Sequence, residues 1–340
     1  MKTPGNVWAA LVTVAVASLA SGCDGPPVET TQKGYRGTGM VQIDSPRLQR
    51  MREVSGNNVV PKADPLAPAD GPRAKSQYQN VPVLGDLSTE EFNRLMLAIT
   101  EWVSPEQGCA YCHNVENMAS DAVPNKIVAR RMFQMTAHIN LDWKSHVADT
   151  GVTCYTCHRG KPVPANIWYK PVEGASSAFA GNRAGQNAPA PQVGLASLPN
   201  DPFTPFIEQA QNIRVVGKEA LPIVDGEKPS IQKTEQTYGL MMHMSQSLGI
   251  NCTGCHNSQG FSNWDQSSPQ RVTAWHGLRL ARDLNVNFLI PLTPNYLPER
   301  LGPTGDAPKL NCATCHQGVN KPLNGVSMIK DYPELNKAVK

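Results

Sequence analysis

One pattern, Cys-x-x-Cys-His, recurs four times along the 340-residue chain. In each copy two thiols lie about one helical turn apart, so both can bond covalently to one porphyrin while the adjoining imidazole reaches its iron. The pattern therefore predicts four covalently bound haem c groups. The copies are Cys109, Cys112 and His113; Cys154, Cys157 and His158; Cys252, Cys255 and His256; and Cys312, Cys315 and His316.

A Cys-x-x-Cys pair can also belong to a zinc site or to a disulfide framework. Neither alternative needs a histidine directly after every pair. The cysteine count also favours haem, because the four pairs use every cysteine of the nine except Cys23.

Cys23 follows a short apolar run at the start of the chain. The stretch has the three parts of an export signal: the basic Lys2, the apolar residues 7–20 and small residues before Cys23. Its apolar run is too short for a membrane-spanning helix. The stretch 1–22 resembles a bacterial lipoprotein signal, which would make Cys23 the lipidated first residue of the mature chain. Two acyl chains would then anchor the protein to a membrane. The alternative is an ordinary secretory peptide with an incidental cysteine.

Composition bounds the function only weakly. The length favours roughly two domains, and a formal net charge of +3 is too small to indicate nucleic acid as a partner. Removal of the signal and addition of the haem propionates would make the mature protein acidic. A clustered negative charge would suit a basic soluble partner.

The first predicted helix leads straight into the first haem motif. It begins at the capping box Ser88-Thr89-Glu90-Glu91, and apolar residues recur at helical spacing over 92–103. Met96 is the one thioether on the apolar face. A methionine there can be core packing, but the helix ends just before Cys109, so Met96 is a candidate sixth ligand for the first haem.

The next two predicted helices each offer several candidate ligands. In the helix over 125–143, Met132 and Met135 share one face, and periodicity does not choose between them. The helix over 231–248 stops at Gly249. Its candidate ligands are Met241, Met242, His243 and Met244.

The haem motifs repeat in pairs. The first and third are followed by Asn, whereas the second and fourth are followed by a variable residue and Gly. Aligning Asn140 with Asn285 places Met132 opposite Gly277. The fourth haem therefore lacks a local methionine, and it must import a ligand, stay open or use the neighbouring His276.

These patterns predict a mainly α fold with extensive irregular loops. We expect a multihaem cytochrome c with two pseudo-repeated haem-pair halves, in which each haem packs on a helix followed by a turn and Cys-x-x-Cys-His. The last of the four helices is expected over 268–284. The predicted segments are a lipoprotein signal over 1–22, an extended N-terminal segment over 23–80, haem-pair half 1 over 81–165, a linker over 166–225, haem-pair half 2 over 226–325 and a C-terminal tail over 326–340.

Four further stretches accompany the motifs: 99–105 (ITEWVSP), 129–132 (ARRM), 151–160 (GVTCYTCHRG) and 330–335 (KDYPEL). With them, the chain resembles the tetrahaem cytochrome c subunit of the photosynthetic reaction centre of purple bacteria. The resemblance covers nearly the whole mature chain and is weakest over 175–199.

The resemblance implies a set of sixth ligands, three methionines and one histidine that crosses over from the other half. At matching positions these are Met96 for the first haem, Met132 for the second, Met241 for the third and His146 for the fourth. His138 and His243 match no ligand position, and His276 stays the local rival for the fourth haem. Arg271 resembles a family arginine whose charge raises the potential of the third haem; a solvated arginine at a helix start is the alternative.

The function implied by the resemblance is electron transfer, not catalysis. A soluble periplasmic donor, such as cytochrome c2 or a high-potential iron-sulfur protein, delivers electrons to the haems. The haem nearest the membrane re-reduces the photo-oxidised bacteriochlorophyll pair. The implied partners are the L and M subunits of the reaction centre, with the H subunit in the same complex, at the periplasmic face of the inner membrane.

Two other classes stay open. A respiratory multihaem carrier would serve a periplasmic reductase and would purify without a bacteriochlorophyll protein. A multihaem enzyme, such as a nitrite-reducing cytochrome, needs an iron with an open position. The sequence offers a candidate sixth ligand for every haem and contains no Cys-x-x-Cys-Lys variant.

Overall fold

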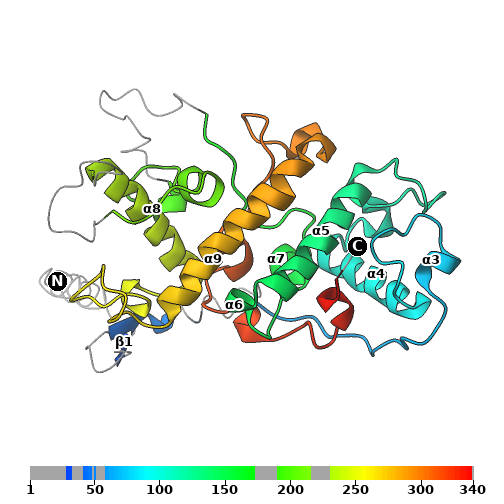
Figure 1. Cartoon of the computed structure of the whole chain (residues 1–340), viewed down its shortest axis with the longest axis horizontal. Coiled ribbons are helices and arrows are strands. Elements are labelled where there is room, and N and C mark those ends of the chain that lie inside the picture. Colours follow the sequence, from blue (N-terminus) through cyan, green and yellow to red (C-terminus); the bar gives the residue numbers. More distant parts are fainter. Residues whose placement is uncertain are drawn as a thin grey trace, which may run out of the picture.

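The computed structural model describes residues 28–32, 41–47, 50, 58–172, 190–215 and 230–338. The predicted signal, residues 1–22, and Cys23 lie outside the described residues. Within the described part of the chain the structure is mainly helical with long irregular connections, as predicted (Figure 1). The one sheet described pairs two short antiparallel strands, β1 (Glu29–Gln32) and β2 (Val41–Asp44).

Four long helices and several short ones position the haem motifs. The long helices are α4 (Thr89–Val103), α5 (Pro124–Asp142), α8 (Ile231–Leu248) and α9 (Gln270–Leu284). The short α-helices are α3 (Ala74–Gln77), α6 (Lys144–Val147), α7 (Cys154–His158) and α10 (Cys312–His316). The short 3-10 and π segments are η2 (Gly108–Tyr111), η3 (Pro191–Val193), η4 (Thr204–Glu208), η5 (Cys252–Gly254), η6 (Asn285–Leu289), η7 (Ile290–Asn295), η8 (Pro298–Arg300), η9 (Pro322–Gly325) and η10 (Pro333–Asn336).

The ends of the long helices follow from their sequences. At the start of α4, the Ser88 hydroxyl accepts from the Glu91 amide at 3.0 Å, and the Glu91 carboxylate accepts from the Ser88 amide at 2.9 Å. This is the predicted capping box, which satisfies two backbone donors that a helix start leaves open. Helix α8 is capped by Gly249, which adopts a left-handed backbone conformation with φ of +64°. Glycine favours this conformation because it has no Cβ.

Helix α9 ends at Leu284, as predicted from the sequence. The chain continues as the π turn η6 and the 3-10 segment η7. Phe288 and Leu289 of η6 are buried in the core, and their burial favours this continued coil after α9.

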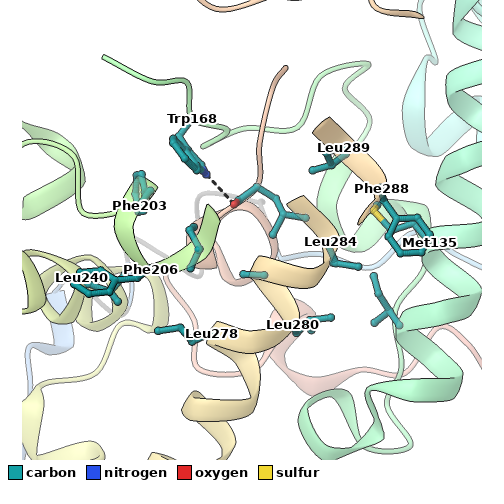
Figure 2. Close-up of a cluster of buried hydrophobic side chains, with 14 residues drawn as sticks. Met135, Trp168, Phe203, Phe206, Leu240, Leu278, Leu280, Leu284, Phe288 and Leu289 are labelled. Carbon is teal, nitrogen blue, oxygen red and sulfur yellow. Dashed lines mark hydrogen bonds between the residues drawn. The ribbon is translucent and has the colours of Figure 1, made fainter. Parts of the chain in front are cut away.

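The larger core joins both predicted halves (Figure 2). It contains Met135 from α5, Leu240 from α8 and Leu278 from α9, and Trp168 donates from its indole nitrogen to the Leu310 carbonyl at 3.0 Å. Segment 190–215, part of the predicted linker, is integral to this core. It contributes Phe203, Phe206 and Ile207, whose exposures are 2 %, 1 % and 1 %.

A second core lies under α4, and the predicted C-terminal tail completes it. Tyr332 packs edge-on against Trp102 with ring centroids 4.5 Å apart. Arg94 lies over the Tyr332 ring at 4.2 Å and pairs with the buried Glu334 at 3.5 Å. The chain therefore returns from the second half to cover the first.

The molecule is elongated, with α8 and the β1–β2 pair toward one end and α3 and α4 toward the other (Figure 1). Helices α5, α6, α7 and α9 lie between them. A search of the described residues for an apolar helix of bilayer-spanning length finds none.

Candidate haem sites

The residues predicted for the first haem line one cavity of about 560 Å³. Met96 comes from α4, and Cys109, Cys112 and His113 come from η2 and the turn after it. Apolar side chains make up most of the remaining wall, among them Val81, Phe92, Ile99, Val103 and Phe133. Two thiols, an imidazole and a thioether around an apolar space of this size fit a covalently attached haem.

All four motif histidines are oriented in the same way. Each places Nδ1 beside a backbone carbonyl, so Nδ1–H donates and the Nε2 lone pair is left for a metal. The four pairs are His113 with Met118 at 3.2 Å, His158 with Lys161 at 2.8 Å, His256 with Phe261 at 2.9 Å and His316 with Val319 at 3.0 Å.

At sites two and four, burial favours the neutral imidazole and the neutral form of the first thiol of each motif. It lowers the pKa of His158, and burial together with the nearby His146 lowers the pKa of His316 to about 4. Burial also raises the pKa of Cys154 and of Cys312 to about 12. A neutral imidazole is the metal-binding form of histidine, whereas zinc takes cysteine as thiolate. The eight motif cysteines are free thiols, which does not support the disulfide alternative.

At the second site, packing separates the two candidate methionines of α5. Met135 is buried in the larger core beside Phe288 (Figure 2). Met132, one turn earlier, is only half-buried at the edge of that core. Met132 is therefore the more accessible of the two thioethers.

At the third site, α8 carries the thioethers. The Met242 side chain packs against Gly194 instead: a Cβ on Gly194 would lie 3.0 Å from the Met242 methyl carbon. Met241 and Met244 are both half-buried against the larger core. Contacts alone therefore exclude one of the three methionines and leave two.

Arg271 stands beside the third site in a fixed position. Its guanidinium donates to the Asn263 carbonyl at 3.0 Å and to the Ser267 hydroxyl at 2.7 Å, and it lies 4.1 Å from the Trp264 ring centroid. Burial lowers the pKa of His256, and the Arg271 charge lowers it further. The side chain is thus held, half-buried, within electrostatic reach of the motif histidine.

At the fourth site, His146 from α6 fills the space above Gly277 of α9. A Cβ on Gly277 would lie 2.5 Å from His146 Cε1, and His146 Nδ1 is 2.9 Å from the Thr273 carbonyl. The His146 and His316 rings face each other edge-on with centroids 6.1 Å apart. The missing side chain at Gly277 is what lets His146 approach His316.

Sites two and four share backbone and side-chain details that the motifs alone do not display. Asn140 exchanges hydrogen bonds with the backbone of Val152, and Asn285 does the same with Leu310. Each partner lies two residues before the first cysteine of a motif. Asn140 and Asn285 are also the two residues whose alignment placed Met132 opposite Gly277. Sequence analysis used them only to set that register and missed their role in holding the motifs.

Three contacts set the order of the sites in space. The Gly160 amide after site two donates to the Trp102 carbonyl of α4 at 2.8 Å. The sulfurs of Cys157 and Cys315 lie 2.9 Å apart, which joins site two to site four. The Gly318 amide after site four donates to the Ser247 carbonyl of α8 at 2.8 Å. The spatial order is therefore one, two, four, three, which differs from the order along the chain.

The remaining histidines have packing partners. His138 lies between Asp142 and Asp283, at 2.7 and 2.6 Å. His243 is buried beside Ser247, and burial lowers its pKa to about 4. His276 contacts Trp275, with ring centroids 4.9 Å apart.

The chain is similar over most of its length to proteins of one family. A family model described as "Photosynthetic reaction centre cytochrome C subunit" matches residues 24–336. The chain is 54% identical to the photosynthetic reaction center cytochrome c subunit of Rubrivivax gelatinosus, over 96% of this chain and 88% of the relative. Subunits of the same name from Thermochromatium tepidum (96% and 80% covered) and Roseobacter denitrificans (92% and 87%) are 49% and 42% identical. The chain belongs to the photosynthetic reaction centre cytochrome c subunit family.

Proposed function

We propose that this chain is a lipid-anchored, periplasmic electron-transfer subunit that carries four haem c groups and re-reduces the photo-oxidised bacteriochlorophyll pair of a reaction centre. The observation that carries the proposal is the cavity of site one, where Met96 and His113 meet the two thiols of the first motif. Membership of the family supports electron transfer in a photosynthetic reaction centre.

The proposed sixth ligands are Met96, Met132, Met241 and His146 for sites one to four. The choice of Met241 is supported by its equivalent position to Met96 when the two halves of the chain are compared. Trp102 and Ser247 accept equivalent hydrogen bonds from the glycines after sites two and four. Met96 lies six residues before Trp102, and Met241 lies six residues before Ser247. The same equivalence supports the proposed two-fold repetition of a haem pair.

His146 is favoured over His276 at the fourth site for two reasons. His146 faces the His316 ring, and Gly277 leaves it the space. The imidazole of His276 instead packs against Trp275. The ligand of site four then comes from the first half of the chain, which ties the halves together.

Bound haem would supply reversible one-electron chemistry at each site. The chain's own residues then set how easily each site gives up an electron. A thioether favours ferrous iron more than a second imidazole does, so site four is expected to have the lowest potential from its ligands alone. The carbonyls that accept from Nδ1 fix the ring orientation of each proximal histidine. Arg271 is expected to raise the potential of site three, because a fixed cation disfavours ferric iron.

The N-terminal anchor indicates which end of the row faces the membrane. Strand β2 packs against η5, which belongs to site three, and β1 pairs with β2. Cys23 lies six positions before Glu29, where β1 begins, so the chain between them can span at most about 20 Å. A lipidated Cys23 would therefore hold site three near the membrane, beside the L and M subunits of a complex that also contains the H subunit. A soluble donor, such as cytochrome c2 or a high-potential iron-sulfur protein, would then deliver electrons at sites farther out.

Flash spectroscopy on membranes containing the protein tests this function. With the haems reduced beforehand, a single-turnover flash should oxidise a haem while the bleached bacteriochlorophyll pair recovers at the same rate. Absence of haem oxidation in membranes whose reaction centres bleach normally would refute the reaction-centre role. Palmitate labelling, compared between the native chain and a Cys23→Ser variant, tests the anchor separately.

A further inference from the structure

A buried lysine contacts the first haem site and has no place in the ligand set. Lys126, in the first turn of α5, is 8 % exposed, and its side chain lines the cavity that contains Met96 and His113. Lysine is seldom buried unless paired, because removing an ammonium from water is costly. A charge kept in such a position needs an explanation.

The Lys126 ammonium is bonded to the loop that orients His113. It donates to the carbonyls of Met118, Ala119 and Ser120, at 2.9, 2.9 and 3.0 Å. The Met118 carbonyl is the same oxygen that lies 3.2 Å from His113 Nδ1. One oxygen therefore accepts from both the ammonium and the imidazole of the first motif.

The local charge beside the cavity is positive. Asp121 lies 3.2 Å from the Lys126 ammonium and 3.0 Å from the Arg130 guanidinium, so one carboxylate faces two cations. Lys126 and Arg130 line the cavity, whereas Asp121 does not. Among the ion pairs described, one carboxylate therefore serves both cations of the cavity wall.

The register that aligns Asn140 with Asn285 also aligns Lys126 with Arg271, since each cation lies fourteen residues earlier. Both donate to the carbonyl eight residues before them, Met118 for Lys126 and Asn263 for Arg271. The two sites at the ends of the row thus share a held cation in the same structural position.

We propose that Lys126 is a positioning residue of the first haem site, which holds the Met118 carbonyl that orients His113 and raises the reduction potential of the haem there. The inference rests on the proposed function, in which His113 binds the iron. A cation close to the iron disfavours the ferric state. An ammonium sharing the Met118 carbonyl also weakens that oxygen as an acceptor for His113, which makes the imidazole a poorer donor to iron. Both effects raise the reduction potential of the haem at site one.

Redox titration of the purified holoprotein, followed in the haem absorption bands, tests the proposal. The wave of site one is identified as the one that a Met96→Leu variant moves. Lys126→Met should move that wave downward, by on the order of tenfold in the reduction equilibrium, about 59 mV for one electron. Lys126→Arg should keep it near its native position. Lys75→Met, which removes an exposed lysine paired with Asp86, should move no wave.

An unmoved wave in Lys126→Met with all haems retained would overturn the proposal, as would an equal downward shift in Lys126→Arg. If Lys126→Met does not retain its haems, Asp121→Asn decides. Loss of that carboxylate should move the same wave upward, and no upward movement overturns the proposal. Failure of the proposed function would show in the native protein instead, as a haem count other than four by mass spectrometry.

Discussion

Two methionines line the cavity of the first site, and only one comes from the helix that precedes the motif. Met96 belongs to α4, whereas Met118 lies in the loop after His113 and contributes its carbonyl to that histidine. A thioether at Met96 would close the sixth position of the iron bound by His113.

Replacing Met96 with Leu should open that position. The change conserves volume and costs less than about 1.5 kcal/mol in packing, so the site should stay folded while the iron loses its thioether. We expect carbon monoxide to bind one of the reduced haems, and its potential to fall, because sulfur favours ferrous iron. Met118→Leu is the matched control and should bind no carbon monoxide. The Met96 assignment fails if the two variants behave alike.

At the scale of residues, the sequence predicts the attachment points of haem directly but leaves several candidates for the sixth ligands. Thioether attachment needs its cysteines and histidine at a fixed spacing, so the four motifs stand out in the chain. Helical periodicity instead places several thioethers on one face. Burial of Met135 and the contact of Met242 with Gly194 distinguish candidates that periodicity could not. The partners of His113 and Lys126 also depend on loop geometry that no local pattern displays.

At the scale of elements, the helix starts and stops were predicted well where capping chemistry marks them. Ser88 and Gly249 mark such ends. The π turns η4 and η6 were not predicted, because both depend on side chains buried against residues that are distant in sequence. Phe203 and Phe206 lie in a stretch rich in proline and glycine, which predicted a linker, yet they pack on α9 and α8 in the core.

Helix α9 admits His146 only because residue 277 is glycine. Gly277→Ala should displace His146, since the new Cβ would lie 2.5 Å from its Cε1. Alanine itself favours the helix by about 1 kcal/mol, so the effect should be local and not a loss of α9. We expect one haem to change from a low-spin, two-histidine spectrum to a high-spin or altered spectrum by electron paramagnetic resonance.

Thr273→Ala is the control in the same helix, one turn before Gly277. Its backbone carbonyl, which lies 2.9 Å from His146 Nδ1, is kept in the variant. The native spectrum should therefore persist. A native spectrum in Gly277→Ala as well would argue against His146 and return His276 as the ligand.

The arrangement of the whole molecule could not be predicted from the order of its motifs. The row one, two, four, three arises because the chain passes from site two across to site three and then returns. The return is held by long-range contacts such as Gly318 with Ser247 and Asn140 with the Leu335 carbonyl, at 2.8 and 2.9 Å. Pair-wise repetition in the sequence indicated two halves, but the shared core and the returning tail unite them.

His138 joins the two halves outside the haem sites. Its imidazole lies between Asp142 of its own helix and Asp283 of α9, and the Trp143 indole donates to the same Asp283 carboxylate at 2.8 Å. Burial by itself would lower the pKa of His138, but hydrogen bonds and charge from Asp283 and Asp142 outweigh it and raise the pKa above 6.5. The doubly protonated ring can donate to both carboxylates, whereas the neutral ring can donate to only one.

The sign of the pH dependence follows from that shift. A raised pKa in the folded state means that the stabilisation from His138 is complete below about pH 6.5 and is lost as pH rises through the folded pKa. His138→Gln should cost on the order of 1 kcal/mol at pH 6, the net value of one hydrogen bond, and progressively less toward pH 8.5. Thermal unfolding midpoints of the holoproteins, measured across that range, should therefore converge as pH rises. A difference between the midpoints of His138→Gln and the native protein that stays constant across this range would contradict a charged bridge between the halves.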